Sequence, residues 1–150
     1  MKKSLKSIIL TIVLFSSTPL LKAQYCTPSY GTGCNSSDVI SYFGLNTISN
    51  SSGCSSGSYA NYDTIPATTL YIGQPYTASV STIFGTAGVS IWIDFNDDFI
   101  YDSSERVGTT TSYIGTNSTG NIAIHIPFGS PVDTHHLRAR LIYNDLGTNA

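Results

Sequence analysis

Apolar side chains alternate with polar ones through most of this chain, and turn residues interrupt the alternation at short intervals. The clearest run is Val89–Phe95, where every second residue is apolar and Trp92 lies on the opposite face. Tyr76–Phe84 and Leu137–Tyr143 alternate in the same way. Period-two patterning rich in β-branched and aromatic residues predicts strands. Many short strands of this kind predict an all-β fold, an antiparallel immunoglobulin-like or jelly-roll-like β-sandwich.

Three further segments carry a weaker form of the same pattern. We predict strands over Asp38–Ile48, with a kink at Gly44, over Thr68–Ile72, and over Asn121–Ile126. The stretch Gly108–Gly120 is rich in Thr, Ser and Gly. Its composition fits either a hairpin tip or a disordered connection, and both alternatives stay open.

The first 23 residues are predicted to be a secretory signal peptide. A basic start containing Lys2 and Lys3 precedes a short apolar stretch, Ile8–Phe15, and small residues lead to a cleavage site after Ala23. A membrane-spanning helix needs about 20 apolar residues, which this stretch does not reach. We therefore expect an exported protein, secreted or on the cell surface, whose single module spans 24–150.

Outside the signal peptide the chain is acidic. It keeps three arginines and no lysine against nine Asp and Glu residues, which gives a net charge of −6. Such a chain lacks the basic patch through which proteins bind nucleic acid or anionic membranes. We expect an extracellular protein or a glycan as partner, with no nucleic acid and no membrane insertion.

Three cysteines, Cys26, Cys34 and Cys54, remain after the signal peptide. In an exported chain they are disulfide candidates before they are metal ligands. A Cys34–Cys54 bond would close a modest loop and leave Cys26 in need of a partner. Spacing alone does not decide the connectivity.

Five of the nine acids lie in the twelve-residue stretch from Asp94 to Glu105. Oxygen-bearing side chains occupy positions 1, 3, 5, 9 and 12, which is the ligand spacing of an EF-hand-type calcium loop. Position 6, where such loops favour Gly for a sharp turn, is Phe99, so the turn could differ in shape. The alternative is a polar loop whose acids are merely solvated. The predicted ligands are Asp94, Asn96, Asp98, Ile100 through its carbonyl, Asp102 directly or through water, and Glu105.

Several segments together resemble the GEVED domain, a β-sandwich module of large secreted and surface proteins of Gram-negative bacteria. The resemblance rests on Tyr25–Pro28, Gly33–Cys34, Ser52–Cys54, Trp92–Asn96 and Leu137–Arg140, in this order and at similar spacing. It implies an accessory or adhesive module without catalytic activity, in proteins that often carry proteases, fibronectin-type repeats and a type IX secretion signal. The acidic segment that names the family, and its fourth cysteine, are absent before Ala150. We therefore expect a module that lacks its C-terminal strand.

Enzymatic alternatives have little support in the sequence. Gly53–Gly57 matches G-x-S-x-G, but that motif needs a strand, a helix and a parallel sheet around it. The histidines His125, His135 and His136 lack the spacing of a zinc site and are expected at the surface.

We predict a non-catalytic, calcium-stabilised module for adhesion or substrate targeting. One alternative is a fragment of a secreted hydrolase or protease whose catalytic part lies beyond residue 150. Another is a carbohydrate-binding module that uses exposed tyrosines or Trp92.

Overall fold

The computed structural model of the protein describes residues 24–27 and 33–146, so the predicted signal peptide lies outside the described residues. Within them the chain forms strands and three short 3-10 helices, and no α-helix. No helix in this part of the chain has the length and apolar character needed to cross a membrane. The strands are β1 (Ile40–Leu45), β2 (Ile48–Ser51), β3 (Tyr76–Thr82), β4 (Ala87–Ile93), β5 (Arg106–Thr109), β6 (Ser118–Ile124) and β7 (Leu137–Tyr143). The 3-10 helices are η1 (Gly33–Ser36), η2 (Ser56–Ser58) and η3 (Ser103–Glu105).

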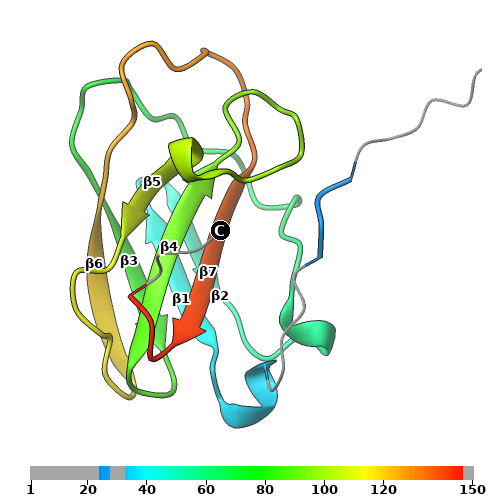
Figure 1. Ribbon diagram of the computed structural model, residues 1–150, viewed down its shortest axis with the longest axis vertical. Coiled ribbons are helices and arrows are strands. Elements are labelled where there is room, and N and C mark those ends of the chain that lie inside the picture. The colour runs from blue at the N-terminus through cyan, green and yellow to red at the C-terminus, as the bar shows by residue number, and fades with distance from the viewer. Residues whose placement is uncertain (1–23, 28–32, 147–150) are drawn as a thin grey trace, which may run out of the picture.

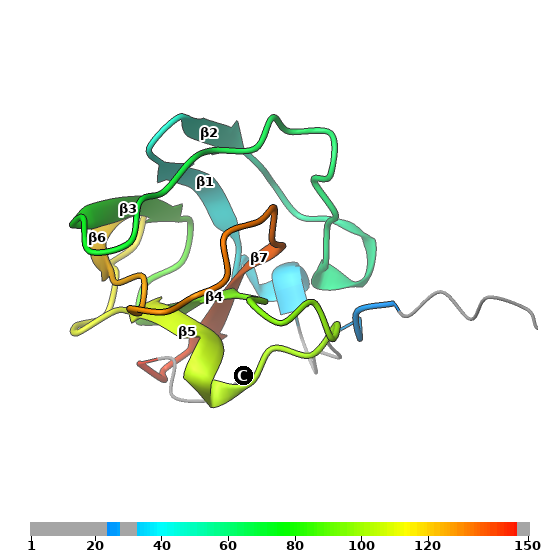
Figure 2. The ribbon, with the colours of Figure 1, turned by 90° about the horizontal axis from the view of Figure 1, so that it is seen from above.

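The strands form two sheets that lie face to face (Figures 1 and 2). One sheet has the order β2-β1-β3-β6 and the other the order β5-β4-β7. Every pairing between these strands is antiparallel. This arrangement confirms the predicted all-β antiparallel sandwich.

The core lies between the sheets and is built by alternation along the strands. On β3, Ala78 and Val80 face inward, and on the neighbouring strand β6, Ile122, the partner of Ala78, and Ile124 do so as well. Removing such side chains from water is the main favourable term in folding. The other buried core members are Phe43, Leu45, Val89, Ile91, Ile93, Val107, Ile114 and Ile126.

Strand β4 is buried along its whole length, including both of its faces. It is the middle strand of its sheet, between β5 and β7. Trp92, on the outer face, is only 1% exposed, and in register it lies between Arg106 on β5 and Arg138 on β7. Long arginine stems can cover apolar surface while their charged ends stay polar. Trp92 is therefore unavailable as a stacking platform for a sugar.

The predicted single strand over Asp38–Ile48 is wrong, because the chain folds back on itself inside it. Strands β1 and β2 form a tight hairpin in which Leu45 pairs with Ile48. Asn46 at the turn has a positive φ of 52°, a conformation that Asn tolerates better than most residues. The kink expected at Gly44 is absent, since Gly44 lies within β1.

The predicted strand Thr68–Ile72 is also wrong, since these residues form no strand. The hairpin turn holds this segment instead, because the side-chain Nδ2 of Asn46 donates to Thr68 Oγ1 at 2.9 Å and to the Thr69 carbonyl at 3.0 Å. Leu70 and Ile72 still pack against the core. Their apolar alternation therefore reflects partial burial without strand pairing.

The stretch after β5 is an ordered connection between the two sheets. Ile114 forms a single bridge with Ala87, with hydrogen bonds of 2.8 and 3.3 Å between their backbone atoms. It is only 4% exposed and belongs to the core. This segment is neither a hairpin tip nor disordered.

We predict that Gly88→Ala destabilises the protein by about 2 kcal/mol, a typical cost of overpacking. A Cβ at Gly88 would overlap the backbone of Asp145 and Leu146, which lie against β4. Gly53→Ala is the matched control, because nothing lies within 4 Å of the added atom. Urea unfolding should show a large loss for Gly88→Ala and less than about 0.5 kcal/mol for Gly53→Ala. Equal losses would contradict the packing of residues 145–146 on β4.

Candidate functional site

The acidic segment Asp94–Glu105 forms the loop that joins β4 to β5 at one end of the sandwich (Figure 1). Its two ends are buried, with Asp94 fully buried and Glu105 4% exposed, while the acids between them are exposed. The loop is also anchored to the residue just before β7, because the Asp94 amide donates to the carbonyl of His136 at 3.0 Å. A carboxylate therefore occupies each fixed end of the connection.

Asp94 has one carboxylate oxygen with hydrogen bonds and one without. Its Oδ2 accepts a hydrogen bond from the hydroxyl of Tyr25 at 2.6 Å and from the Phe99 amide at 3.0 Å. Its Oδ1 is buried and has no hydrogen-bond partner among the described residues. A buried acceptor without a hydrogen bond destabilises the folded state by about 1–3 kcal/mol, and a charged acceptor does so by more. Such an atom therefore points to a further partner, such as a water or an ion.

The middle of the loop repeats one local hydrogen-bond pattern. Asn96 Oδ1 accepts from the Asp98 amide at 3.0 Å, and Asp98 Oδ1 accepts from the Ile100 amide at 2.8 Å. Asp97 and Phe99, which alternate with these residues, have positive φ angles of 54° and 69°. Phe99 at position 6 thus adopts the left-handed conformation for which Gly is favoured, despite its side chain. The replacement of Gly leaves the sharp turn in place.

Glu105 closes the loop through the backbone. Its Oε1 accepts from the Phe95 amide at 3.0 Å and its Oε2 accepts from the Asp102 amide at 3.3 Å. Burial raises the pKa of the Glu105 carboxyl, and the hydrogen bonds from these amides oppose that shift. Asp102 in turn caps η3 by accepting from the Ser104 amide at 2.7 Å. Both residues have structural contacts in addition to any role as ligands.

The predicted ligands are thus only partly assembled. All five predicted side-chain ligands accept hydrogen bonds from backbone amides, and Asp94 alone keeps a buried oxygen, Oδ1, without a partner among the described residues. Across residues 24–27 and 33–146, no three Asp, Glu, His or Cys side chains form a group able to hold a metal ion. A cation in this loop would also need the amide oxygen of Asn96 and the carbonyl of Ile100.

Asp97, which the spacing places outside the ligand set, has a separate partner. His135 Nδ1 lies 3.2 Å from Asp97 Oδ1, and the His135 ring packs against Phe95. Burial lowers the pKa of His135, but hydrogen bonds to Asp97 and to the Pro131 carbonyl raise it by more, so the net shift is upward. The side chain of His135 is only 8% exposed, which corrects its predicted surface position. His125 and His136 are exposed, as predicted.

Aromatic residues that the sequence did not identify surround the acidic loop. Tyr25 stacks on Tyr101 with ring centroids 4.9 Å apart, and the guanidinium carbon of Arg138 lies 4.3 Å from the Tyr101 ring centre. Burial raises the pKa of Tyr101 to about 12, against the opposing effect of Arg138. Burial and the hydrogen bond to Asp94 raise the pKa of Tyr25, so its hydroxyl stays a donor. No spacing rule predicts these contacts, because they join segments far apart in sequence.

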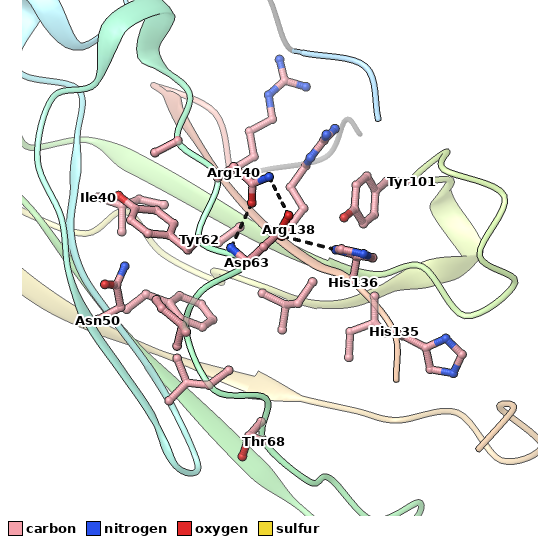
Figure 3. A pocket seen from close by; sticks show the side chains of 18 of the residues that line it. Ile40, Asn50, Tyr62, Asp63, Thr68, Tyr101, His135, His136, Arg138 and Arg140 are labelled. Atoms are coloured by element: carbon pink, nitrogen blue, oxygen red, sulfur yellow. Dashed lines mark hydrogen bonds and ion pairs between the residues drawn. The ribbon is translucent and has the colours of Figure 1, made fainter. Parts of the chain in front are cut away.

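A pocket of about 840 Å³ lies beside β7, with residues of β1 and β2 and of the irregular segment 59–72 also in its wall (Figure 3). Within it, His136 Nδ1 lies 3.8 Å from Asp63 Oδ1. Apolar side chains from both sheets form part of the lining, together with Arg138 and Arg140. The apolar contributors include Ile40, Phe43, Ile48, Leu70, Leu137, Ala139 and Leu141.

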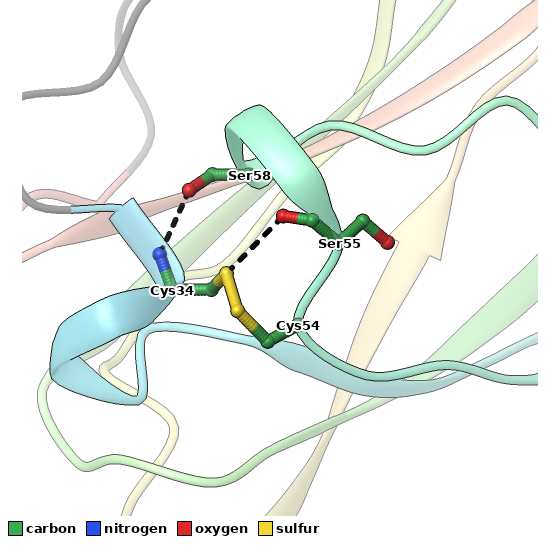
Figure 4. The surroundings of a disulfide bond; sticks show 4 residues. All are labelled: Cys34, Cys54, Ser55 and Ser58. Atoms are coloured by element: carbon green, nitrogen blue, oxygen red, sulfur yellow. Dashed lines mark hydrogen bonds between the residues drawn. A yellow bond between two sulfur atoms is a disulfide. The ribbon is translucent and has the colours of Figure 1, made fainter.

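Cys34 and Cys54 form a disulfide bond with their Cα atoms 5.3 Å apart (Figure 4). The Cys34 amide also donates to the hydroxyl of Ser58 at 2.9 Å, and this hydrogen bond joins η1 to η2. Cys26 is an exposed free thiol. The bond between Cys34 and Cys54, which spacing had left open, is therefore present. Because Cys54 is in this bond and all strand pairings are antiparallel, the match of Gly53–Gly57 to a nucleophile motif has no structural support.

Comparison with known families shows that residues 88–150 match the model of the GEVED domain. The match runs from β4 through the acidic loop to β7 and covers less than half of the chain. It confirms, for this part of the chain, the resemblance that the sequence shows. Searches of curated proteins and of solved structures found no match.

We predict that Glu105→Ala lowers the free energy of unfolding by about 2–3 kcal/mol even with a calcium chelator present. The change removes a charged acceptor from two backbone amides. Ser103→Ala, in an exposed position of the same loop, serves as the control and should change stability by less than about 0.5 kcal/mol. Urea unfolding measures both variants. A loss for Glu105→Ala that appears only with calcium present would assign this residue solely to ion binding.

The double variant Cys34→Ser, Cys54→Ser should lose about 3 kcal/mol, because the bond closes a loop with a sequence separation of 20. Cys26→Ser is the matched control and should leave stability unchanged, since its thiol is free. Alkylation without reductant, followed by mass spectrometry, should label Cys26 alone. Labelling of all three thiols would show that the disulfide is absent.

Proposed function

We propose that the protein is a non-catalytic β-sandwich module of an exported protein, stabilised by calcium in the loop Asp94–Glu105, and used for adhesion or substrate targeting. The premise is the GEVED match of residues 88–150. The observation that carries the calcium assignment is the Oδ1 atom of Asp94, buried without a hydrogen bond at the start of the loop. A calcium ion is a hard cation that takes oxygen ligands of this kind.

The residues that would hold the ion differ in their orientation and in the hydrogen bonds that they already accept. Asp94, Asn96 and Asp98 lie on a stretch whose turns and positive φ angles already place alternate residues alike. Ile100 would contribute its carbonyl. Asn96, Asp98, Asp102 and Glu105 all accept hydrogen bonds from backbone amides, so each would bind the ion while sharing or releasing such a bond. The ion supplies positive charge that offsets the repulsion among five acids in twelve residues.

An extracellular setting is supported by two features. The Cys34–Cys54 bond belongs to an oxidising compartment. The predicted signal peptide gives a route to export, and extracellular modules meet calcium concentrations near the millimolar range, where weak sites are filled. A calcium-tied loop that joins the middle strand to an edge strand would stiffen a sandwich exposed to proteases.

Adhesion or targeting needs a surface for a partner, and the pocket beside β7 offers one. Its lining combines apolar side chains with polar and charged groups, the mixture typical of binding sites. A segment of an extracellular protein bound there would contact apolar side chains and the two arginines together.

A second candidate is carbohydrate binding, which the same pocket favours because Tyr59, Tyr62 and Tyr101 line it. Tyrosine rings can pack against sugar faces. Binding in a glycan array that is lost on substituting Tyr62, which is 41% exposed, would support this candidate. The alternative of a hydrolase fragment depends on sequence beyond residue 150, where a catalytic motif would have to lie.

We predict that calcium binds with a dissociation constant on the order of 10⁻⁴ to 10⁻³ M. At ten times that constant the folded state gains about 1.4 kcal/mol, which raises the melting temperature by several degrees. Magnesium should give a smaller rise, because its octahedral shell suits a bidentate carboxylate poorly. Differential scanning calorimetry with and without a chelator measures the shift.

Two variants distinguish a predicted calcium ligand from a neighbouring acid outside the ligand set. Asp94→Ala should abolish the calcium-dependent rise, whereas Asp97→Ala, whose side chain faces His135, should retain it. Each variant is compared with itself in chelator, so changes in intrinsic stability cancel. The calcium assignment would be contradicted if calcium left the melting temperature of the intact protein unchanged. It would also be contradicted if both variants changed the calcium-dependent rise equally.

A further inference from the structure

The short N-terminal segment 24–27 reaches the acidic loop through Tyr25. The Tyr25 hydroxyl donates to Asp94 Oδ2 at 2.6 Å across a sequence separation of 69 residues. Its ring lies 5.1 Å from that of Phe99 and 5.0 Å from that of His136, centre to centre. Tyr25 therefore contacts the first residue of the acidic loop, the residue at its sharp turn, and His136, the residue just before β7.

A second anchor holds the same segment. Arg138 Nη2, on β7, donates to the carbonyl of Cys26 at 2.9 Å. Its guanidinium also lies over the ring of Tyr101, which in turn stacks on Tyr25. Segment 24–27 is thus joined to β7 and to the loop at once.

These contacts decide which oxygen of Asp94 is left for a ligand. Oδ2 already accepts from the Tyr25 hydroxyl and the Phe99 amide, so rotation of the carboxylate would break both bonds. Oδ1 remains buried and without a partner. A hydrogen bond to the second oxygen of a ligating carboxylate fixes its orientation, and removing such a bond typically costs about 10–100-fold in metal affinity.

We propose that Tyr25 is a positioning residue of the acidic loop: its hydroxyl holds Asp94 with Oδ1 available, which couples docking of segment 24–27 to cation binding. The part that concerns the cation rests on the proposed function. The part that concerns the loop does not, because it needs only the hydrogen bonds of Asp94 Oδ2 with Tyr25 and Phe99. Reciprocity requires that calcium then tightens the docking of segment 24–27 by the same factor.

Tyr25→Phe tests this proposal, since it removes only the hydroxyl. Tyr59→Phe is the matched control, because Tyr59 also lies near Arg138, at 5.9 Å, without a hydrogen bond to Asp94. In chelator, hydrogen exchange of the Phe99 amide should be about 10-fold faster in Tyr25→Phe and unchanged in Tyr59→Phe. Isothermal titration calorimetry should show calcium binding weakened about 10-fold in Tyr25→Phe alone.

The two measurements separate failure of this inference from failure of the proposed function. Unchanged Phe99 exchange in Tyr25→Phe would overturn the positioning role. Faster exchange with unchanged calcium affinity would overturn the coupling. If the unsubstituted protein binds no calcium while Tyr25→Phe speeds Phe99 exchange, the calcium function is wrong, the coupling falls with it, and Tyr25 still positions the loop.

Discussion

A buried carboxylate at the end of the middle strand is the constraint on which the functional end of this molecule depends. Asp94 continues the fully buried strand β4, and its amide still bonds to the segment before β7. Its side chain then has to be satisfied inside the protein. One oxygen is satisfied by Tyr25 and Phe99, and the other is not. The fold of the loop, the docking of the N-terminal segment and the proposed ion all follow from this one group.

The acidic loop shows how a local spacing rule and a tertiary contact combine. The spacing of Asp94, Asn96 and Asp98 is a property of the short sequence itself, and it could be read there. The roles of Tyr25 and Arg138 could not, because their partners lie 69 and 112 residues away. Phe99 shows a second limit of the spacing rule, because it adopts a positive φ at position 6 although the rule favours Gly there. The hydrogen bond from its backbone amide to Asp94 and the contact of its ring with Tyr25 hold a left-handed conformation that the residue type disfavours.

The sandwich was predictable where apolar alternation coincides with strand pairing, and it was misread where a turn or a loop carries the same alternation. From Ala78 on in β3, and at Ile122 and Ile124 in β6, every second residue is buried, so the period of two indicated both the strand and its inward face. Asp38–Ile48 carries the same composition, yet Asn46 turns the chain, and a hairpin replaces one long strand. Thr68–Ile72 alternates because Leu70 and Ile72 touch the core, although hydrogen bonds to a turn replace strand pairing. Strand β5 escaped prediction because it is only four residues long.

The most direct test of the account is to locate the ion. Crystals of the intact protein grown in calcium, with diffraction data collected at long wavelength, give an anomalous map in which calcium is visible. The account predicts one peak at about 2.4 Å from Asp94 Oδ1, a normal calcium–oxygen distance, beside Asn96 and Asp98. A map with no peak at Asp94 Oδ1, or with calcium bound only elsewhere, would contradict it.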